Sequence, residues 1–161
     1  MEAKAKLLGH PIHQMLIVLP LGVLTMAVIF DIIHLLGGGL QWAQVAYWMI
    51  VAGVIAGLIS APFGLIDWLG IPSDTRAKRI GLIHGIGNVV VVLLFAVSWL
   101  MRRPIPEAPS STAYVFSFVG LVLAAFTGWL GGELVDRLGV GVHTGAHVNA
   151  PSSLSRRPTG I

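Results

Sequence analysis

Three histidines stand where their imidazoles could act as ligands for a metal ion or a haem iron. His10 and His13 are three residues apart near the N-terminus, and His84 follows much later in the chain. Imidazole nitrogens bind zinc and iron and serve as axial ligands of haem. Asp67 could add a carboxylate oxygen, and Asn88 lies one helical turn after His84. These residues can act together only if the fold brings their segments to one place.

The composition shows what kind of fold must do this. Of 161 residues, 55% are hydrophobic and only 11% are charged, and the mean hydropathy is +0.85. A soluble domain carries roughly 25% charged residues, so we expect an integral membrane protein of one small domain. The chain has no cysteine, which excludes disulfides, iron–sulfur ligation and thiol catalysis within it. It also has no phosphate-binding loop, nucleophile triad or nucleic-acid motif, so we predict no catalytic residue and no nucleic-acid partner.

Four apolar segments are long enough to cross a bilayer, which takes about 20 residues. They cover approximately residues 11–36, 42–69, 80–101 and 113–138. No segment alternates polar and apolar residues as a barrel strand would. The sequence therefore predicts an all-α membrane protein, a four-transmembrane-helix bundle over residues 1–138. A polar tail over 139–161 follows, and we expect His143 and His147 to be solvated there.

The basic residues predict the orientation of the bundle, because cytoplasmic connections carry an excess of lysine and arginine. Eight of the ten lie on the side of the two termini: Lys4, Lys6, Arg76, Lys78, Arg79, Arg137, Arg156 and Arg157. Only Arg102 and Arg103 lie on the other side, in the connection before the fourth segment. We therefore expect both termini to be cytoplasmic.

With this orientation, His10, His13, Asp67, His84 and Asn88 fall in the cytoplasmic half of the membrane. At about 1.5 Å per residue, His13 and His84 lie at similar depths behind the basic residues that precede them. The first and third helices of an up-and-down bundle face each other diagonally, and bundle cofactors bind between facing helices. A haem b between His13 and His84 is therefore possible, with Asn88 beside it, Arg79 near a propionate and His10 as a substitute ligand.

Two other interpretations of the same residues stay open. His10, His13, Asp67 and His84 together form a donor set suited to non-haem zinc or iron. Alternatively, these groups bind no cofactor and only form hydrogen bonds with one another and with helix ends. In the opposite half of the membrane, Asp31 and His34 are one turn apart, and we expect them to form a hydrogen-bonded pair.

A weak internal repeat accompanies this arrangement. The segment Lys6-Leu-Leu-Gly-His-Pro-Ile-His13 resembles Arg79-Ile-Gly-Leu-Ile-His84, and Ala61-Pro-Phe-Gly64 resembles Ala125-Phe-Thr-Gly128. Two duplicated hairpins would be related by a pseudo-two-fold axis along the membrane normal. Rows of small residues on the helices would allow close packing within the bundle, in a homodimer or against a partner.

Several motifs in order along the chain resemble one family. They are Gly9-His-Pro-Ile-His13, Leu19-Pro-Leu-Gly22, Gly64-Leu-Ile-Asp67-Trp68, the stretch from Arg79 through His84 to Asn88, and Leu130-Gly-Gly-Glu-Leu-Val135. The chain is similar to bacterial membrane proteins of domain-of-unknown-function family 2231, and this resemblance implies a location in a bacterial inner membrane. The family has no established activity, but similar domains occur fused to Rieske iron–sulfur domains. The resemblance therefore implies a redox neighbour, which here would be a separate protein.

These observations lead to one functional expectation and its alternatives. We expect a small haem b-binding electron-transfer subunit or redox partner in the lipid bilayer. The alternatives are a non-catalytic structural or assembly subunit of a larger membrane complex, and a divalent-metal-binding membrane protein. Its protein partner would be such a complex, a separate redox protein or a second copy of the chain.

Overall fold

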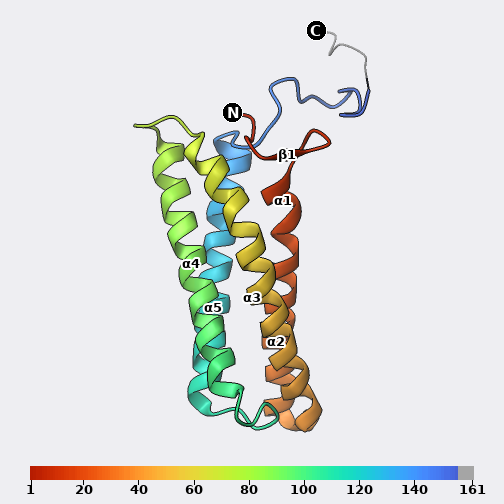
Figure 1. Cartoon of the computed structure of the whole chain (residues 1–161), viewed down its shortest axis with the longest axis vertical. Coiled ribbons are helices and arrows are strands. Elements are labelled where there is room, and N and C mark those ends of the chain that lie inside the picture. The colour runs from red at the N-terminus through yellow and green to blue at the C-terminus, as the bar shows by residue number, and fades with distance from the viewer. Residues whose placement is uncertain (156–161) are drawn as a thin grey trace.

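Four long helices run up and down the computed structural model, which describes residues 1–155 (Figure 1). The first span consists of α1 (Ile12–Leu16), α2 (Val18–Ile33) and the π-helical turn η1 (His34–Gly38). The others are α3 (Leu40–Leu69), α4 (Arg76–Arg102) and α5 (Ser111–Gly132), which continues into η2 (Glu133–Arg137). Each span has 27 or 30 residues and enough apolar character to cross a membrane, so the predicted four-helix membrane fold is confirmed.

Local signals in the sequence set the helix ends. The side chains of Thr75 and Ser110 accept hydrogen bonds from the backbone N–H groups of Lys78 and Ala113, and so cap α4 and α5. The first span ends where Gly37 and Gly39 adopt φ angles of 94° and 91°. Only glycine takes such angles without strain, so the chain can reverse there directly into α3.

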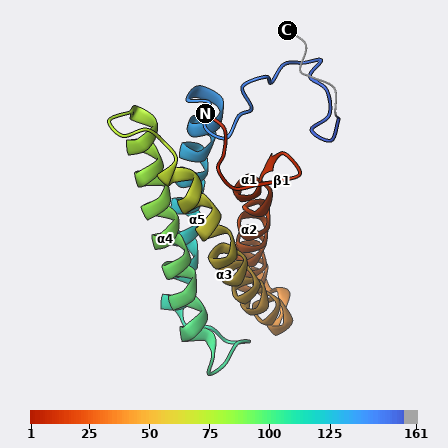
Figure 2. The same ribbon diagram turned by 45° about the horizontal axis from the view of Figure 1, so that its top comes forward.

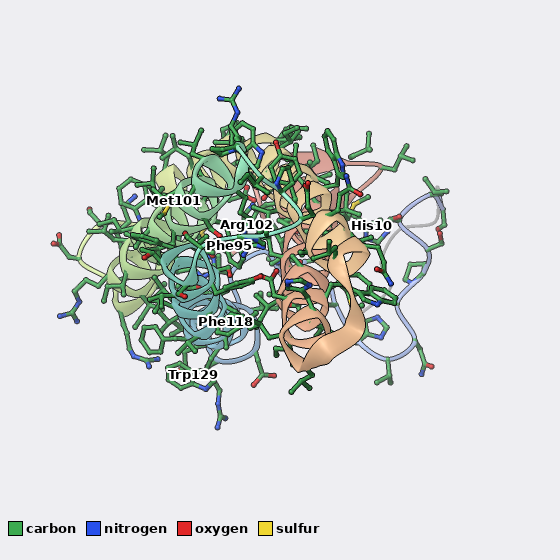
Figure 3. All side chains as sticks on the ribbon, turned by 90° about the horizontal axis from the view of Figure 1, so that it is seen from below. His10, Phe95, Met101, Arg102, Phe118 and Trp129 are labelled. Carbon is green, nitrogen blue, oxygen red and sulfur yellow. The ribbon has the colours of Figure 1, made fainter. Side chains whose placement is uncertain are left out.

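The helices pack as two hairpins. The most extensive contacts join α2 to α3 and α4 to α5, and α3 packs on α4 to unite the two pairs. The buried cluster at their centre is apolar: Leu24, Ala27, Val28, Ile50, Val54, Val91, Phe95 and Ala124. Seen along the bundle, Phe95 and Arg102 lie toward the interior and Trp129 at the periphery (Figure 3).

The outer surface of the helices is largely apolar. Leu58 on α3, Val89 on α4 and Val122 on α5 are 59%, 55% and 73% exposed. In water such a surface would be costly, whereas in a bilayer it contacts lipid tails. The exposed side chains thus place the bundle in the lipid bilayer, in agreement with its span lengths.

Both ends of the described chain lie at one end of the bundle (Figure 2). Before α1, the short strands β1 (Lys6–Leu7) and β2 (His10–Pro11) form a hairpin. The amino group of Met1 donates to the Gly139 carbonyl over 2.7 Å, and the Gly141 N–H donates to the Met1 carbonyl over 2.8 Å. The start of the tail is therefore docked on the N-terminal segment.

That this end is cytoplasmic stays a prediction. Of the basic residues on which it depends, Arg156 and Arg157 lie outside the described residues.

Candidate functional site

His13 is held against α3 by one hydrogen bond and one close packing contact. Its Nδ1 atom lies 3.1 Å from the carbonyl oxygen of Ser60. Because a carbonyl only accepts, this nitrogen must carry a hydrogen and donate it. The ring lies over Gly64, where an added Cβ would be 2.7 Å from Cε1 of the imidazole. The glycine therefore creates the space that the ring occupies.

His84 is held against α5 in the same way. Its Nδ1 atom lies 2.9 Å from the carbonyl oxygen of Thr127, to which it donates. The ring lies near Gly131, where an added Cβ would be 3.1 Å from Cε1. The amide of Asn88 is 3.2 Å from Nε2 of His84, and its oxygen accepts from the Thr127 hydroxyl over 3.0 Å. These hydrogen bonds fix both the ring and its tautomer.

The two imidazoles face each other inside the bundle. Their ring centres are 6.5 Å apart and their planes are almost perpendicular, at 87°. Since each Nδ1 donates to a carbonyl, Nε2 is the nitrogen of each ring that would bind a metal. The structure thus brings together the imidazoles of His13 and His84, from α1 and α4.

Asp67 is engaged elsewhere. Its carboxylate accepts the backbone N–H groups of Lys4 and Ala5, over 2.6 and 3.0 Å. It therefore ties the N-terminal segment to the end of α3. Such a partner leaves no signature in the sequence, because every residue carries a backbone N–H.

Of the remaining predicted site residues, His10 is engaged away from the histidine pair, and Arg79 lies five residues before His84. His10 is on β2, outside the helices (Figure 3), with Nε2 3.2 Å from the hydroxyl of Ser153. Arg79 is exposed on α4. Among residues 1–155, no three histidine, aspartate or glutamate side chains are grouped so that they could hold a metal ion. The proposed zinc or iron set of His10, His13, Asp67 and His84 is therefore not assembled.

Comparison with known proteins agrees with the architecture. Residues 9–144 match the family described as "Predicted membrane protein (DUF2231)". The chain belongs to this family. The match begins in the turn of the β1–β2 hairpin and ends in the tail, so it includes all four helices and both histidines. No curated protein and no solved structure matches the chain.

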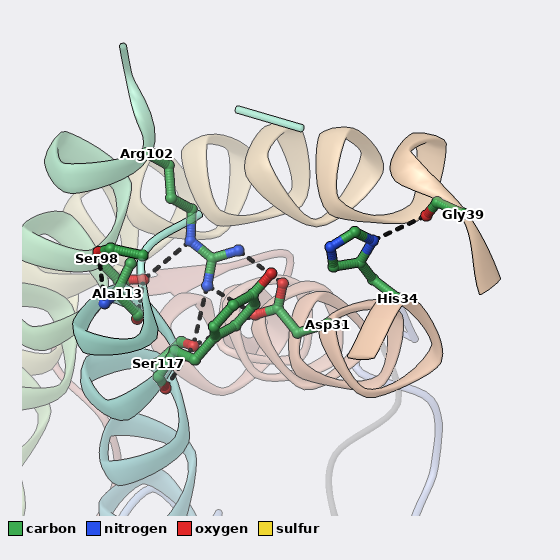
Figure 4. A network of polar contacts seen from close by, with 9 residues as sticks. Asp31, His34, Gly39, Ser98, Arg102, Ala113 and Ser117 are labelled. Carbon is green, nitrogen blue, oxygen red and sulfur yellow. Dashed lines mark hydrogen bonds and ion pairs between the residues drawn. The ribbon is translucent and has the colours of Figure 1, made fainter. Parts of the chain in front are cut away.

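The opposite end of this DUF2231 protein holds a buried ion pair that the sequence analysis missed. Asp31 on α2 and Arg102 on α4 are both 0% exposed. Their side chains form two hydrogen bonds, of 2.6 and 2.7 Å (Figure 4). The arginine also donates to the hydroxyls of Ser98 and Ser117, each over 3.1 Å. The guanidinium is thus paired and hydrogen-bonded, which a buried charge requires.

The expected Asp31–His34 pair is therefore wrong. Nδ1 of His34 lies 2.9 Å from the carbonyl of Gly39 and helps to close the turn before α3 (Figure 4). Arg102 was assigned to the connection before the fourth span, but it is the last residue of α4. The available signal was Asp31 itself, because an ionisable residue inside a span needs a partner.

Proposed function

We propose that this protein holds one haem b between His13 and His84 and acts as a small electron-transfer subunit or redox partner in the membrane. One observation carries the proposal. Two imidazoles from facing helices are held alike, each with Nδ1 donating to a main-chain carbonyl and Nε2 left as the donor nitrogen.

The hydrogen bonds of the two rings and their proximity support this proposal. A metal-ligating histidine almost always donates its other N–H to a carbonyl, carboxylate or water, which orients the ring and raises its basicity. The ring centres of His13 and His84 are 6.5 Å apart, so both rings could hold one haem. Ligation would require His84 to give up the hydrogen bond from Asn88 at Nε2.

The proposed ligands also favour one kind of chemistry. A haem with two protein ligands supplies one-electron transfer, because no coordination position is left for a substrate. Arg79 lies five residues before His84 and would pair with a propionate at the end of the bundle. With no cysteine in the chain, the electron donor or acceptor would be a separate protein.

The test is the absorption spectrum of the purified protein after expression with ample haem, together with metal analysis. We expect a Soret band that shifts on reduction. His84→Ala and His13→Ala should each abolish or shift it, since each removes one ligand. His10→Ala is the matched control and should keep the band, because His10 lies outside the helices.

Each other outcome contradicts the proposal. If the wild-type protein takes up no haem, the protein is better explained as a structural or assembly subunit. Zinc or iron without haem would favour the divalent-metal alternative. A band that survives both His13→Ala and His84→Ala would show that haem binds at another place.

A further inference from the structure

The contacts of the first helical hairpin recur in the second. In the first, His13 donates to the Ser60 carbonyl and lies over Gly64. In the second, His84 donates to the Thr127 carbonyl and lies at Gly131. In both hairpins the glycine is four residues after the accepting carbonyl.

The same correspondence continues toward the middle of the bundle. Leu24 of α2 fills the space beside Gly53 of α3. Phe95 of α4 fills the space beside Gly120 of α5, where an added Cβ would lie 2.9 Å from the ring. Leu24 and Phe95 are separated by 71 residues in the sequence. The same number separates His13 from His84 and Asp31 from Arg102. A second constant spacing, slightly shorter, relates α3 to α5: the distance along the chain from Gly53 to Gly120 equals that from Gly64 to Gly131.

Burial follows these two spacings as well. The corresponding residues are fully buried in both hairpins: Ala27 and Ser98, Ala46 and Ala113, Ile50 and Ser117. Because buried residues correspond at these spacings, the alignment of the two hairpins differs from the one predicted from the sequence. Gly64 corresponds to Gly131 rather than to Gly128, because the packing of the imidazoles fixes the alignment.

We infer that the chain is a fused dimer, in which α1–α3 and α4–α5 are two copies of one two-helix unit and each copy is the binding partner of the other. The ion pair shows how this interface is specified. Asp31 and Arg102 occupy equivalent positions, yet they carry opposite charges and bind each other. Two identical copies would bury two carboxylates or two guanidiniums without a counter-charge, which is costly. Opposite charges therefore favour pairing of the two unlike halves.

The test exchanges the charged cluster between the two halves of the full chain. Ser98 and Ser117, which accept from Arg102, correspond to Ala27 and Ile50. A sixfold variant carries D31R, A27S and I50S together with R102D, S98A and S117I, and so rebuilds the cluster on the other side. The readouts are the monodisperse fraction in detergent size-exclusion chromatography and the thermal midpoint.

Equivalence of the halves predicts a specific order of outcomes. D31R and R102D alone should each lose most of the monodisperse protein, because each leaves two like charges buried together. The sixfold variant should recover a fraction and a midpoint close to those of the wild type. The matched control carries only A27S, I50S, S98A and S117I and should be less stable than the sixfold variant, since Arg102 then lacks both hydroxyl acceptors.

The inference is overturned if the sixfold variant is no more stable than D31R alone or than the matched control. Failure of every variant to fold would overturn it equally, since equivalent positions require recovery.

Discussion

An alanine at position 64 should push the His13 imidazole away from α3. The added Cβ would lie 2.7 Å from Cε1 and 2.9 Å from Nδ1, whereas ordinary carbon contacts are about 3.5–4 Å. Relief of this overlap moves the ring by roughly 1 Å and removes its hydrogen bond to Ser60. Overpacking costs about 1–3 kcal/mol and the hydrogen bond about 1 kcal/mol. Alanine's higher helix propensity offsets about 1 kcal/mol of this cost. We therefore expect the free energy of unfolding to fall by roughly 1–3 kcal/mol in Gly64→Ala.

Gly128→Ala is the matched control for this change. Gly128 is also within a helix, but an added Cβ there meets nothing within 4 Å. Its free energy of unfolding should stay unchanged or rise by up to about 1 kcal/mol. The assay is reversible unfolding in mixed detergent micelles, with the His13 Nδ1–H followed by NMR. Equal stability of the two variants, or an unchanged His13 signal in Gly64→Ala, would refute the argument that the glycine makes room for the ring.

Three further predictions concern the ends of the bundle. Arg102→Met leaves the Asp31 carboxylate buried and unpaired, and should lower the free energy of unfolding by about 3–5 kcal/mol in the same assay. The double variant Asp31→Leu/Arg102→Met should have a free energy of unfolding within about 1 kcal/mol of the wild type. A double variant as unstable as Arg102→Met would contradict this. The ion pair with Lys6, then hydrogen bonds from Thr144, lower the pKa of Glu2 from 4.5 to about 2. The hydrogen bonds by which Glu2 holds Thr144 of the tail should therefore be fully formed above pH 4.5 and weaken as the pH falls through about 2. NMR of the Thr144 amide measures this change, and Glu2→Gln should abolish the pH dependence. Reporter fusions in the α4–α5 connection should read external and fusions after α5 internal, and the reverse result would overturn the orientation.

The spans and the meeting of the two histidines could be predicted because both depend on distance along a helix. A long apolar segment must form a helix in lipid, and a fixed rise per residue then sets the depth of each side chain. His13 and His84 meet for that reason. Their anchors could not be foreseen, because the carbonyls of Ser60 and Thr127 are available in any sequence.

The ion pair was missed for a different reason. Arg102 follows an apolar segment and precedes a proline-rich connection, which made it look like a residue at the membrane surface. In the structure α4 extends to Arg102 itself, and the side chain points inward to Asp31. The charge of an isolated residue does not reveal whether it faces lipid, water or a counter-charge. That information is in how α2, α4 and α5 are arranged around the ion pair.

The apolar cluster at the middle of the bundle separates two very different environments. On α4, Asn88 beside the imidazoles and Ser98 beside the ion pair are roughly 15 Å apart along the helix. The buried cluster between them consists of hydrocarbon side chains alone. Protons move along chains of hydrogen-bonding groups or water, and the buried side chains of this cluster carry no hydrogen-bonding group. The imidazoles and the ion pair therefore lie on opposite sides of an apolar layer, each near one end of the bundle. This layer insulates the two polar sites from each other.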